Sequence, residues 1–176
     1  MKTIDDFATQ LLEESKRFLE KFEASNSPAY LHAALNLAFC SLEAHVNAIA
    51  EEFMTRTELT PWDKAVLSER AVELHDGEYC LTSRLKIHRL EDRVLYLCKR
   101  FSKKPIDRSS AEWSQFKIAI QLRNELTHPK NAVELTHSTV SNALFAIINI
   151  LDVIYRAIYK QDYPHKHMQL TSSLSF

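Results

Sequence analysis

Residues 28–54 read PAYLHAALNLAFCSLEAHVNAIAEEFM, and this stretch predicts a long helix at the centre of the fold. Its large apolar residues recur at intervals of three and four, which places them along one side of a helix. Small residues, which allow neighbouring helices to approach closely, lie between them at Ala33, Ala34 and Ala38. The stretch therefore indicates a central helix that other helices surround.

The composition of the whole chain agrees with a helical fold. Its 176 residues suit one domain, and they include one glycine, Gly77, and five prolines. Sheet proteins need turn glycines at short intervals, so this scarcity favours long helices with few connections. We predict an all-α protein, an antiparallel bundle of five to six helices over residues 1–160, followed by a polar and partly disordered C-terminal tail over residues 161–176.

Caps, prolines and apolar spacing divide the rest of the bundle. A turn is expected at residues 75–77, and Ser109 with Glu112 matches a capping box at a helix start. The segment 82–101 is assigned to a helix because apolar residues follow a four-three rhythm from Ile87 to Phe101. Besides the central helix, helices are expected at residues 3–24, 60–73, 82–101, 109–128 and 136–160.

Composition also bears on location. No run of about eighteen apolar residues is present, which predicts no transmembrane helix and no membrane partner. The N-terminus lacks an apolar signal core. The three cysteines are odd in number and widely spaced, so buried reduced thiols in a cytoplasmic protein are expected; they are Cys40, Cys80 and Cys98.

The net charge of −1 hides an asymmetry along the chain. Residues 43–78 carry nine acidic and three basic residues, whereas residues 84–108 carry nine basic and three acidic. The basic stretch is suited to attract phosphate backbones, and a solvated helix face is the alternative interpretation. The RNA-binding candidates are Arg100, Lys103, Lys104 and, further along, Lys130.

The stretch QLRNELTHPK, residues 121–130, brings a permanent cation, an amide and an imidazole together at a helix end. Asn124 and His128 are four residues apart and share a helix face, whereas Arg123 and His128 would lie roughly 140° apart in a continuous helix. Pro129 disfavours the α conformation of the residue before it. It therefore ends the helix at His128 and frees the imidazole to approach Arg123.

This set of groups suits one kind of chemistry. Arginine presents a fork of donors to phosphate oxygens, and an imidazole transfers protons near neutral pH. Neither a carboxylate cluster for magnesium nor a Cys and His set for zinc accompanies them, so no metal and no cofactor is expected. RNA cleavage by the substrate's own 2′-hydroxyl needs a base and a cation of this type. On spacing alone, a salt-bridging arginine and a helix-terminal histidine are the more common explanation.

The motif in its helical context resembles the HEPN superfamily, whose hallmark is R-x4-6-H with a polar residue after the arginine. Arg123, Asn124 and His128 match it near the end of the penultimate long helix, and residues 36–52, NLAFCSLEAHVNAIAEE, resemble the family's second helix. Glu43 occupies a position there that is often polar, and it is a candidate to support the site. Polar side chains on this helix are otherwise expected to form a solvated face.

The resemblance implies a metal-independent endoribonuclease that leaves a 2′,3′-cyclic phosphate and a 5′-hydroxyl. Arg123 would neutralise the scissile phosphate, His128 would act as acid or base, and Asn124 would orient the histidine or the phosphate. The family further implies a homodimer with a composite active site, and a role in toxin–antitoxin or antiviral defence, with a cognate antitoxin protein as a candidate partner.

Two alternatives stand beside this interpretation. A catalytically inactive HEPN-like module for dimerisation or partner binding is one, although such members often lose the arginine or the histidine. A nucleotide-binding bundle is the other, and no motif supports it. In one branch of the family a modified tyrosine follows two residues after the histidine; Lys130 stands there in this chain, so regulation by adenylylation at that residue is not expected.

Overall fold

The computed structural model describes residues 3–102 and 105–176 of the chain. These residues form six α-helices, a two-stranded antiparallel sheet and one short 3-10 helix. In chain order the elements are α1 (Ile4–Ser25), α2 (Pro28–Met54), α3 (Pro61–Ser68), β1 (Arg70–His75), β2 (Glu78–Leu85), α4 (Leu90–Ser102), α5 (Ala111–Thr127), α6 (His137–Tyr159) and η1 (Lys166–Met168).

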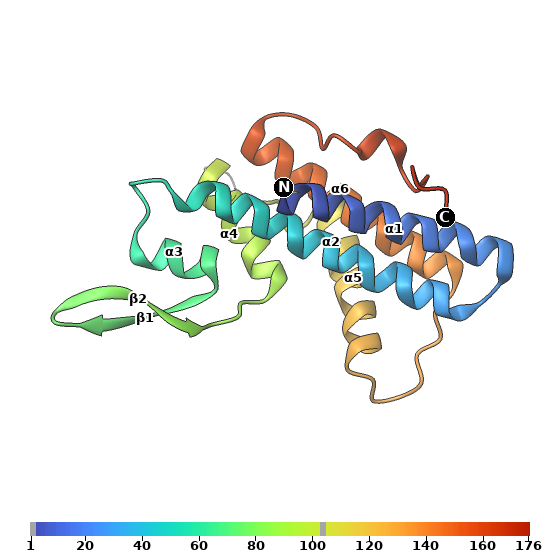
Figure 1. Cartoon of the computed structure of the whole chain (residues 1–176), viewed down its shortest axis with the longest axis horizontal. Helices are drawn as coiled ribbons and strands as arrows, with labels where there is room; N and C mark the ends of the chain where they lie inside the picture. Colours follow the sequence, from blue (N-terminus) through green and yellow to red (C-terminus); the bar gives the residue numbers. More distant parts are fainter. Residues whose placement is uncertain (1–2, 103–104) are drawn as a thin grey trace.

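Three long helices form the body of the molecule, and α6 is its core. Helices α1, α2 and α6 run side by side, while α3, α4 and the hairpin gather at one end and α5 projects from the body (Figure 1). Leu144, Ile147, Leu151 and Ile154 recur along one side of α6 and are all fully buried. Helix α2 is central as predicted, and its small residues Ala34 and Ala38 are also fully buried.

The helix starts follow side-chain caps, with one correction. Thr3, Thr60 and Thr136 each form a capping box, in which the threonine side chain accepts a hydrogen bond from the third helical amide. The capping box predicted for Ser109 and Glu112 is wrong by one residue. Ser110 caps α5 by accepting from the Trp113 amide at 3.2 Å, because the Ser109 hydroxyl is already bonded to Asp107 at 2.6 Å.

The prediction of an all-helical chain is wrong between residues 70 and 85, where a β-hairpin forms. Helix α3 ends early because Glu69 adopts a left-handed conformation (φ 51°), and the chain enters β1. The Asp76-Gly77 turn has positive φ at both residues, 49° and 87°, the geometry that joins two strands most tightly. In the register of the hairpin, Leu74 lies opposite Tyr79, and Glu73 lies opposite Cys80.

The helix predicted over residues 82–101 is therefore correct only in its second half. Helix α4 begins at Leu90, and its seam residues Val94 and Leu97 are buried as expected. Ile87, which began the predicted apolar rhythm, is 80% exposed in the connection that precedes α4. The solvated helix face considered for the basic stretch does not include Arg93, which is buried against Glu69 and Asn47.

The segment from residue 161 onward, predicted as a partly disordered polar tail, packs along the body of the molecule (Figure 1). Tyr163 is 2% exposed, and its hydroxyl meets Nε2 of the buried His45 at 3.1 Å. The Tyr163 amide and the Lys166 ammonium donate to the two carboxylate oxygens of Asp152, at 3.1 and 2.6 Å. The buried side chains of His45 and Asp152 thus hold this segment in place, and the spacing of apolar residues in the sequence does not reveal such polar contacts.

Two helices meet a simple test for membrane spans. By length and hydropathy, α2 and α6 are long enough and apolar enough to cross a bilayer. Of their most apolar windows, 56% and 67% are buried within the fold, and the core helices of many folds pass the same test.

The cysteines are all free, but the prediction that they are buried is correct for Cys98 alone. Cys40, on α2, and Cys80, on β2, are exposed.

A polar cluster joins α3 to α4 and yields a prediction about stability. Burial by itself raises the pKa of Asp63, but hydrogen bonds from Tyr96, Thr60 and Arg100 outweigh burial and hold that pKa well below its usual range. A depressed pKa in the folded state contributes stability above pH of about 4, and this stability is lost as the pH falls further. We expect Asp63→Asn to lower the free energy of unfolding by about 1–3 kcal/mol at pH 7.

Urea unfolding at pH 7 and pH 3 checks this expectation, with the exposed Glu58→Gln as the matched control. The difference between wild type and Asp63→Asn should shrink at pH 3. An equal difference in unfolding free energy between the two proteins at both pH values would contradict a depressed pKa of Asp63.

The packed C-terminal segment yields a second prediction. Tyr163→Ala removes a buried aromatic ring and should lower the free energy of unfolding by about 3–5 kcal/mol. The exposed His167→Ala, in the same segment, should change it by less than about 0.5 kcal/mol. Thermal unfolding of both variants measures the difference, and equal melting temperatures would show that residues 161–176 are a loose appendage.

Candidate functional site

The site is built on α5, which is fixed to the body of the fold by one side. Trp113, Phe116 and Ala119 are buried, as predicted for the core of this helix. Arg123 lies four residues after Ala119 and seven after Phe116, so it continues the same side of α5 beyond the core, and Asn124 is exposed beside it. The packing of α5 on the body therefore directs Arg123 towards Phe39 and Glu43 of α2.

Helix α5 ends as the proline predicted. His128 is the C-cap, its amide still donates to the Asn124 carbonyl at 2.9 Å, and its φ and ψ of −128° and 59° leave the helical region. The imidazole is exposed and makes no hydrogen bond within residues 3–102 and 105–176. It is therefore free to exchange a proton with a ligand.

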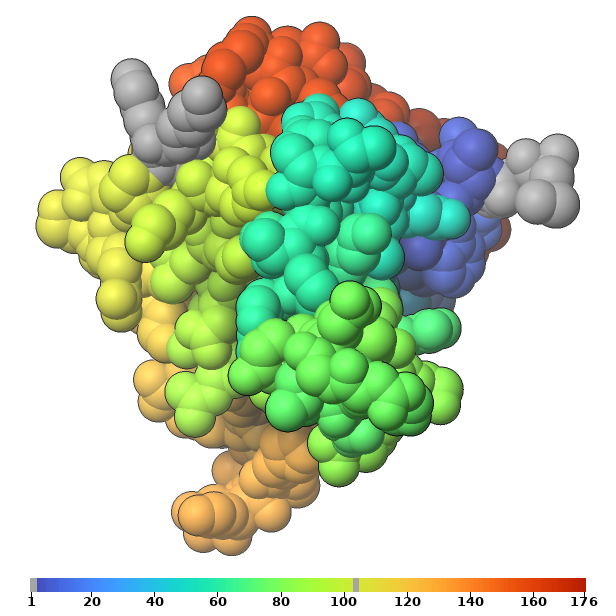
Figure 2. All heavy atoms as spheres, turned by 90° about the vertical axis from the view of Figure 1, so that its left-hand side faces the viewer, coloured from blue at the N-terminus to red at the C-terminus, as the bar shows by residue number. Residues whose placement is uncertain are grey.

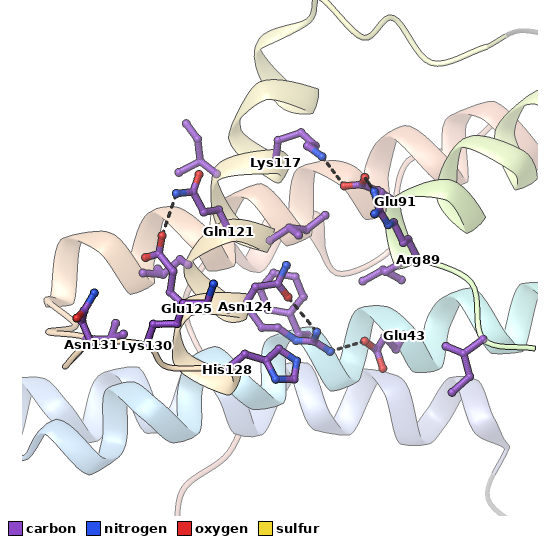
Figure 3. Close-up of a pocket in the computed structure, with 18 of the residues that line it drawn as sticks. Glu43, Arg89, Glu91, Lys117, Gln121, Asn124, Glu125, His128, Lys130 and Asn131 are labelled. Atoms are coloured by element: carbon purple, nitrogen blue, oxygen red, sulfur yellow. Dashed lines mark hydrogen bonds and ion pairs between the residues drawn. The ribbon is translucent and has the colours of Figure 1, made fainter.

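Arg123 links the helix end to α2. Its Nη2 atom lies 2.8 Å from Oε1 of Glu43, and its Nη1 donates to Oδ1 of Asn124 at 3.3 Å. The guanidinium carbon is 5.7 Å from the centre of the Phe39 ring. Figure 3 shows Asn124, His128 and Glu43 around the same opening, with Glu43 coming from α2 and the other two from the end of α5.

These residues line one wall of a wide groove with a volume of about 1380 Å³. This volume exceeds the range of about 300–1,000 Å³ that is usual for small-molecule sites. Viewed from the hairpin end, the surface is hollowed between the orange segment after α5 and the yellow-green segment before α4 (Figure 2). The groove is lined by residues 39 and 43, 87–91, 117–118, 120–125, 128 and 130–134.

Most charges in the groove are paired with one another. Lys117 and Arg89 both contact Glu91, and Arg123 contacts Glu43. Lys130 lines the groove without a carboxylate partner in the described part of the chain. The walls carry four acidic and four basic residues among apolar ones, and Lys130, two residues after His128, has no ion-pair partner among them.

The structure brings together most of the predicted site residues. Arg123, Asn124, His128, Glu43 and Lys130 all line the groove.

The structure does not place the other RNA-binding candidates in the groove. Arg100 is absent from the groove and pairs with Asp63 at 3.1 Å. Lys103 and Lys104 lie outside the described residues. Sequence reasoning missed three groove residues. His88 and Arg89 were placed in the helix predicted over residues 82–101, and no sequence feature distinguished Lys117.

Cys40 lies one helical turn before Glu43, and the charges of Glu43 and Arg123 both affect the pKa of its thiol. Partial burial of the sulfur and the Glu43 carboxylate raise the pKa of this thiol, although the residue as a whole is exposed, and the lowering effect of Arg123 does not offset them. The thiol stays protonated at neutral pH, which makes it a poor nucleophile. Two histidines, His88 and His128, line the groove itself.

Within the described ranges, no group of three or more His, Cys, Asp or Glu side chains is placed to hold a metal ion.

No family model, curated protein or solved structure matches the chain.

The end of α5 yields a prediction about Pro129. Pro129→Ala lifts the restriction on His128, and we expect α5 to extend by several residues and to carry the imidazole away from Arg123. Backbone carbon chemical shifts of residues 126–131 should become helical, whereas Pro164→Ala should leave them unchanged. Unaltered shifts in Pro129→Ala would show that other contacts end the helix.

Proposed function

We propose that the groove is the active site of a metal-independent endoribonuclease with a HEPN-like bundle. The observation that carries the proposal is the joint placement of Arg123, Asn124 and His128 on one wall of an open groove. The groove is large enough for a polymer, and the only unpaired cation on its described walls, Lys130, lies next to the motif.

Each group has a defined role in the proposed reaction. His128 accepts the proton of a 2′-hydroxyl, whose oxygen forms a bond to the adjacent phosphorus as the bond from phosphorus to the 5′-oxygen breaks. The leaving 5′-oxygen takes up a proton, so the products are a 2′,3′-cyclic phosphate and a 5′-hydroxyl. Arg123 stabilises the negative charge on the phosphorane, and Asn124 holds one edge of the guanidinium through its Oδ1 atom.

A homodimer would complete this site. One protomer offers a single exposed motif histidine, whereas the reaction needs both a base and an acid. Ile87 and Ile118 are 80% and 68% exposed on the walls of the groove, and exposed apolar side chains of this size favour a protein contact. A second copy across the groove would cover them and supply its own His128 as the acid.

A role in a toxin–antitoxin or antiviral defence system, in the cytoplasm and with an antitoxin as partner, is part of the same proposal. Its support is the resemblance of the motif and of residues 36–52 to HEPN ribonucleases. An intracellular RNA-cleaving activity of this kind would require restraint in healthy cells, which is the physical need that an inhibitory partner would meet.

The second candidate is a catalytically inactive HEPN-like module that binds a partner protein. The pairing of Arg89, Lys117 and Arg123 with carboxylates favours it, because a groove for RNA gains affinity from uncompensated cations. The exposed Ile87 and Ile118 suit this alternative equally well. Retention of arginine, asparagine and histidine together favours catalysis.

Cleavage of total RNA and tRNA in EDTA tests the proposal. Wild-type protein should cleave, and His128→Ala and Arg123→Ala should each lower the rate by about 10²–10⁴-fold. The matched control is His167→Ala, an exposed histidine outside the groove, which should cleave like wild type. No cleavage by wild-type protein would support the inactive module, and cleavage that requires magnesium would refute the mechanism.

A further inference from the structure

The guanidinium of Arg123 already holds an anion in the free protein. The Glu43 carboxylate accepts a hydrogen bond from Nη2 at 2.8 Å, and Oδ1 of Asn124 accepts one from Nη1 at 3.3 Å. A guanidinium has five N–H donors, so donors remain for a ligand beside Glu43. Any phosphate that binds Arg123 must therefore lie next to a carboxylate on the same planar group.

We propose that Glu43 is a specificity-determining residue that lowers the affinity of Arg123 for terminal phosphate groups more than its affinity for internal phosphodiesters. The ligand class, a nucleic-acid phosphate, rests on the function proposed above. An internal phosphodiester carries one negative charge, whereas a terminal phosphate monoester carries about −1.5 to −2 at pH 7. Repulsion by the Glu43 carboxylate grows in proportion to the charge of the ligand, so it disfavours the monoester more strongly.

The distance between the two anions makes this repulsion effective. Both would contact one guanidinium, which places them within about 6 Å of each other, closer than the Debye length of about 8 Å at physiological salt. The side chains of Glu43 and Arg123 are 42% and 32% exposed, so the pair is half-shielded from solvent rather than fully hydrated. We expect a penalty of roughly tenfold in affinity for each unit of ligand charge.

The other charges of the groove act on both kinds of phosphate. Lys117 and Arg89 are engaged by Glu91, and Lys130 has no ion-pair partner in the described part of the chain. Attraction by Arg123 and Lys130, like repulsion by Glu43, grows with the charge of the ligand, so Glu43 reduces the advantage that the cations give to the monoester. This reduction suits an endonuclease, which binds within a chain rather than at its phosphorylated end.

A purely orienting role for Glu43, through its hydrogen bond to Arg123, differs from the charge-based role in a measurable way. If Glu43 only orients Arg123 through its hydrogen bond, Glu43→Gln keeps an acceptor oxygen for Nη2 and leaves the preference between ligands unchanged. If the charge of Glu43 sets the preference, Glu43→Gln and Glu43→Ala both shift it towards the monoester. The conservative Glu43→Asp keeps the charge and should retain most of the wild-type preference.

The experiment compares two matched ligands, thymidine 5′-phosphate and its methyl ester. They share base and sugar, lack a 2′-hydroxyl, and differ by one ionisable oxygen. Dissociation constants come from NMR titrations of wild-type protein, Glu43→Gln, Glu43→Ala and Glu43→Asp at pH 7.5, with chemical-shift changes at residues 121–128 locating the ligand. Glu134→Gln is the control, because it removes the same charge from the same groove at a residue with no contact to Arg123.

We expect Glu43→Gln to shift the ratio of the two dissociation constants by about tenfold towards the monoester, relative to wild-type protein. Glu134→Gln should shift it by less than about twofold. An unchanged ratio in Glu43→Gln, or no binding of either ligand at the groove, overturns the proposal. Because neither ligand can be cleaved by 2′-hydroxyl attack, the shift would stand even if the protein proved inactive on RNA.

Discussion

Helix α6 is buried along almost its whole length, and the placement of the other helices depends on its packing. Its fully buried residues include Val140, Leu144, Ile147 and Ile154, so apolar side chains contact it from several directions. Helix α5 packs on α6 with Phe116 and Ala119 buried, and Arg123 on the same side of α5 reaches Glu43 of α2. The distance between Arg123 and Glu43 is thus a consequence of core packing. The ion pair contributes little to stability, because half-exposed pairs are worth about 0–1 kcal/mol.

Most cations in the groove form ion pairs, so the groove has no surplus of positive charge. Three of its cations lie against carboxylates, and Lys130 has no ion-pair partner in the described part of the chain. Such a surface attracts nucleic acid weakly from a distance, and affinity must arise from specific contacts made close to His128 and Arg123. This property fits both a site that is completed by a second copy and a site whose arginine discriminates between phosphates by their charge.

The sequence predicted the helices whose limits are set by caps and prolines. Thr3, Pro28, Thr60 and Thr136 act locally through one hydrogen bond or one fixed dihedral angle, so their effects can be read without knowledge of the fold. The end of α5 belongs to the same class, because Pro129 acts on His128 alone. For this reason the motif residues, and Glu43 through the family resemblance, were found before the structure was known.

The hairpin and the C-terminal segment could not be predicted in this way. The four-three rhythm begins at Ile87, in the connection between β2 and α4, so its first residue matches a helix only by coincidence. The turn expected at residues 75–77 forms at Asp76-Gly77, but it joins two strands instead of two helices. Tyr163 is held by His45, which lies 118 residues away in the sequence, and by Asp152 of α6, which lies 11 residues away. Contacts of this kind depend on where α2 and α6 meet, which apolar spacing does not specify. The positions of Arg89 and Lys117 in the groove follow from the same long-range packing.

One measurement addresses the central claim, that the Arg123, Asn124 and His128 wall cleaves RNA through the substrate's own 2′-hydroxyl. A cleaved RNA is resynthesised with a single 2′-deoxynucleotide on the 5′ side of the scissile phosphate and incubated with the protein in EDTA. The account predicts that the all-ribose RNA yields a 2′,3′-cyclic phosphate and that the single deoxy substitution abolishes cleavage at that bond. Equal cleavage of both substrates, or a product that ends in a 3′-hydroxyl, would contradict it.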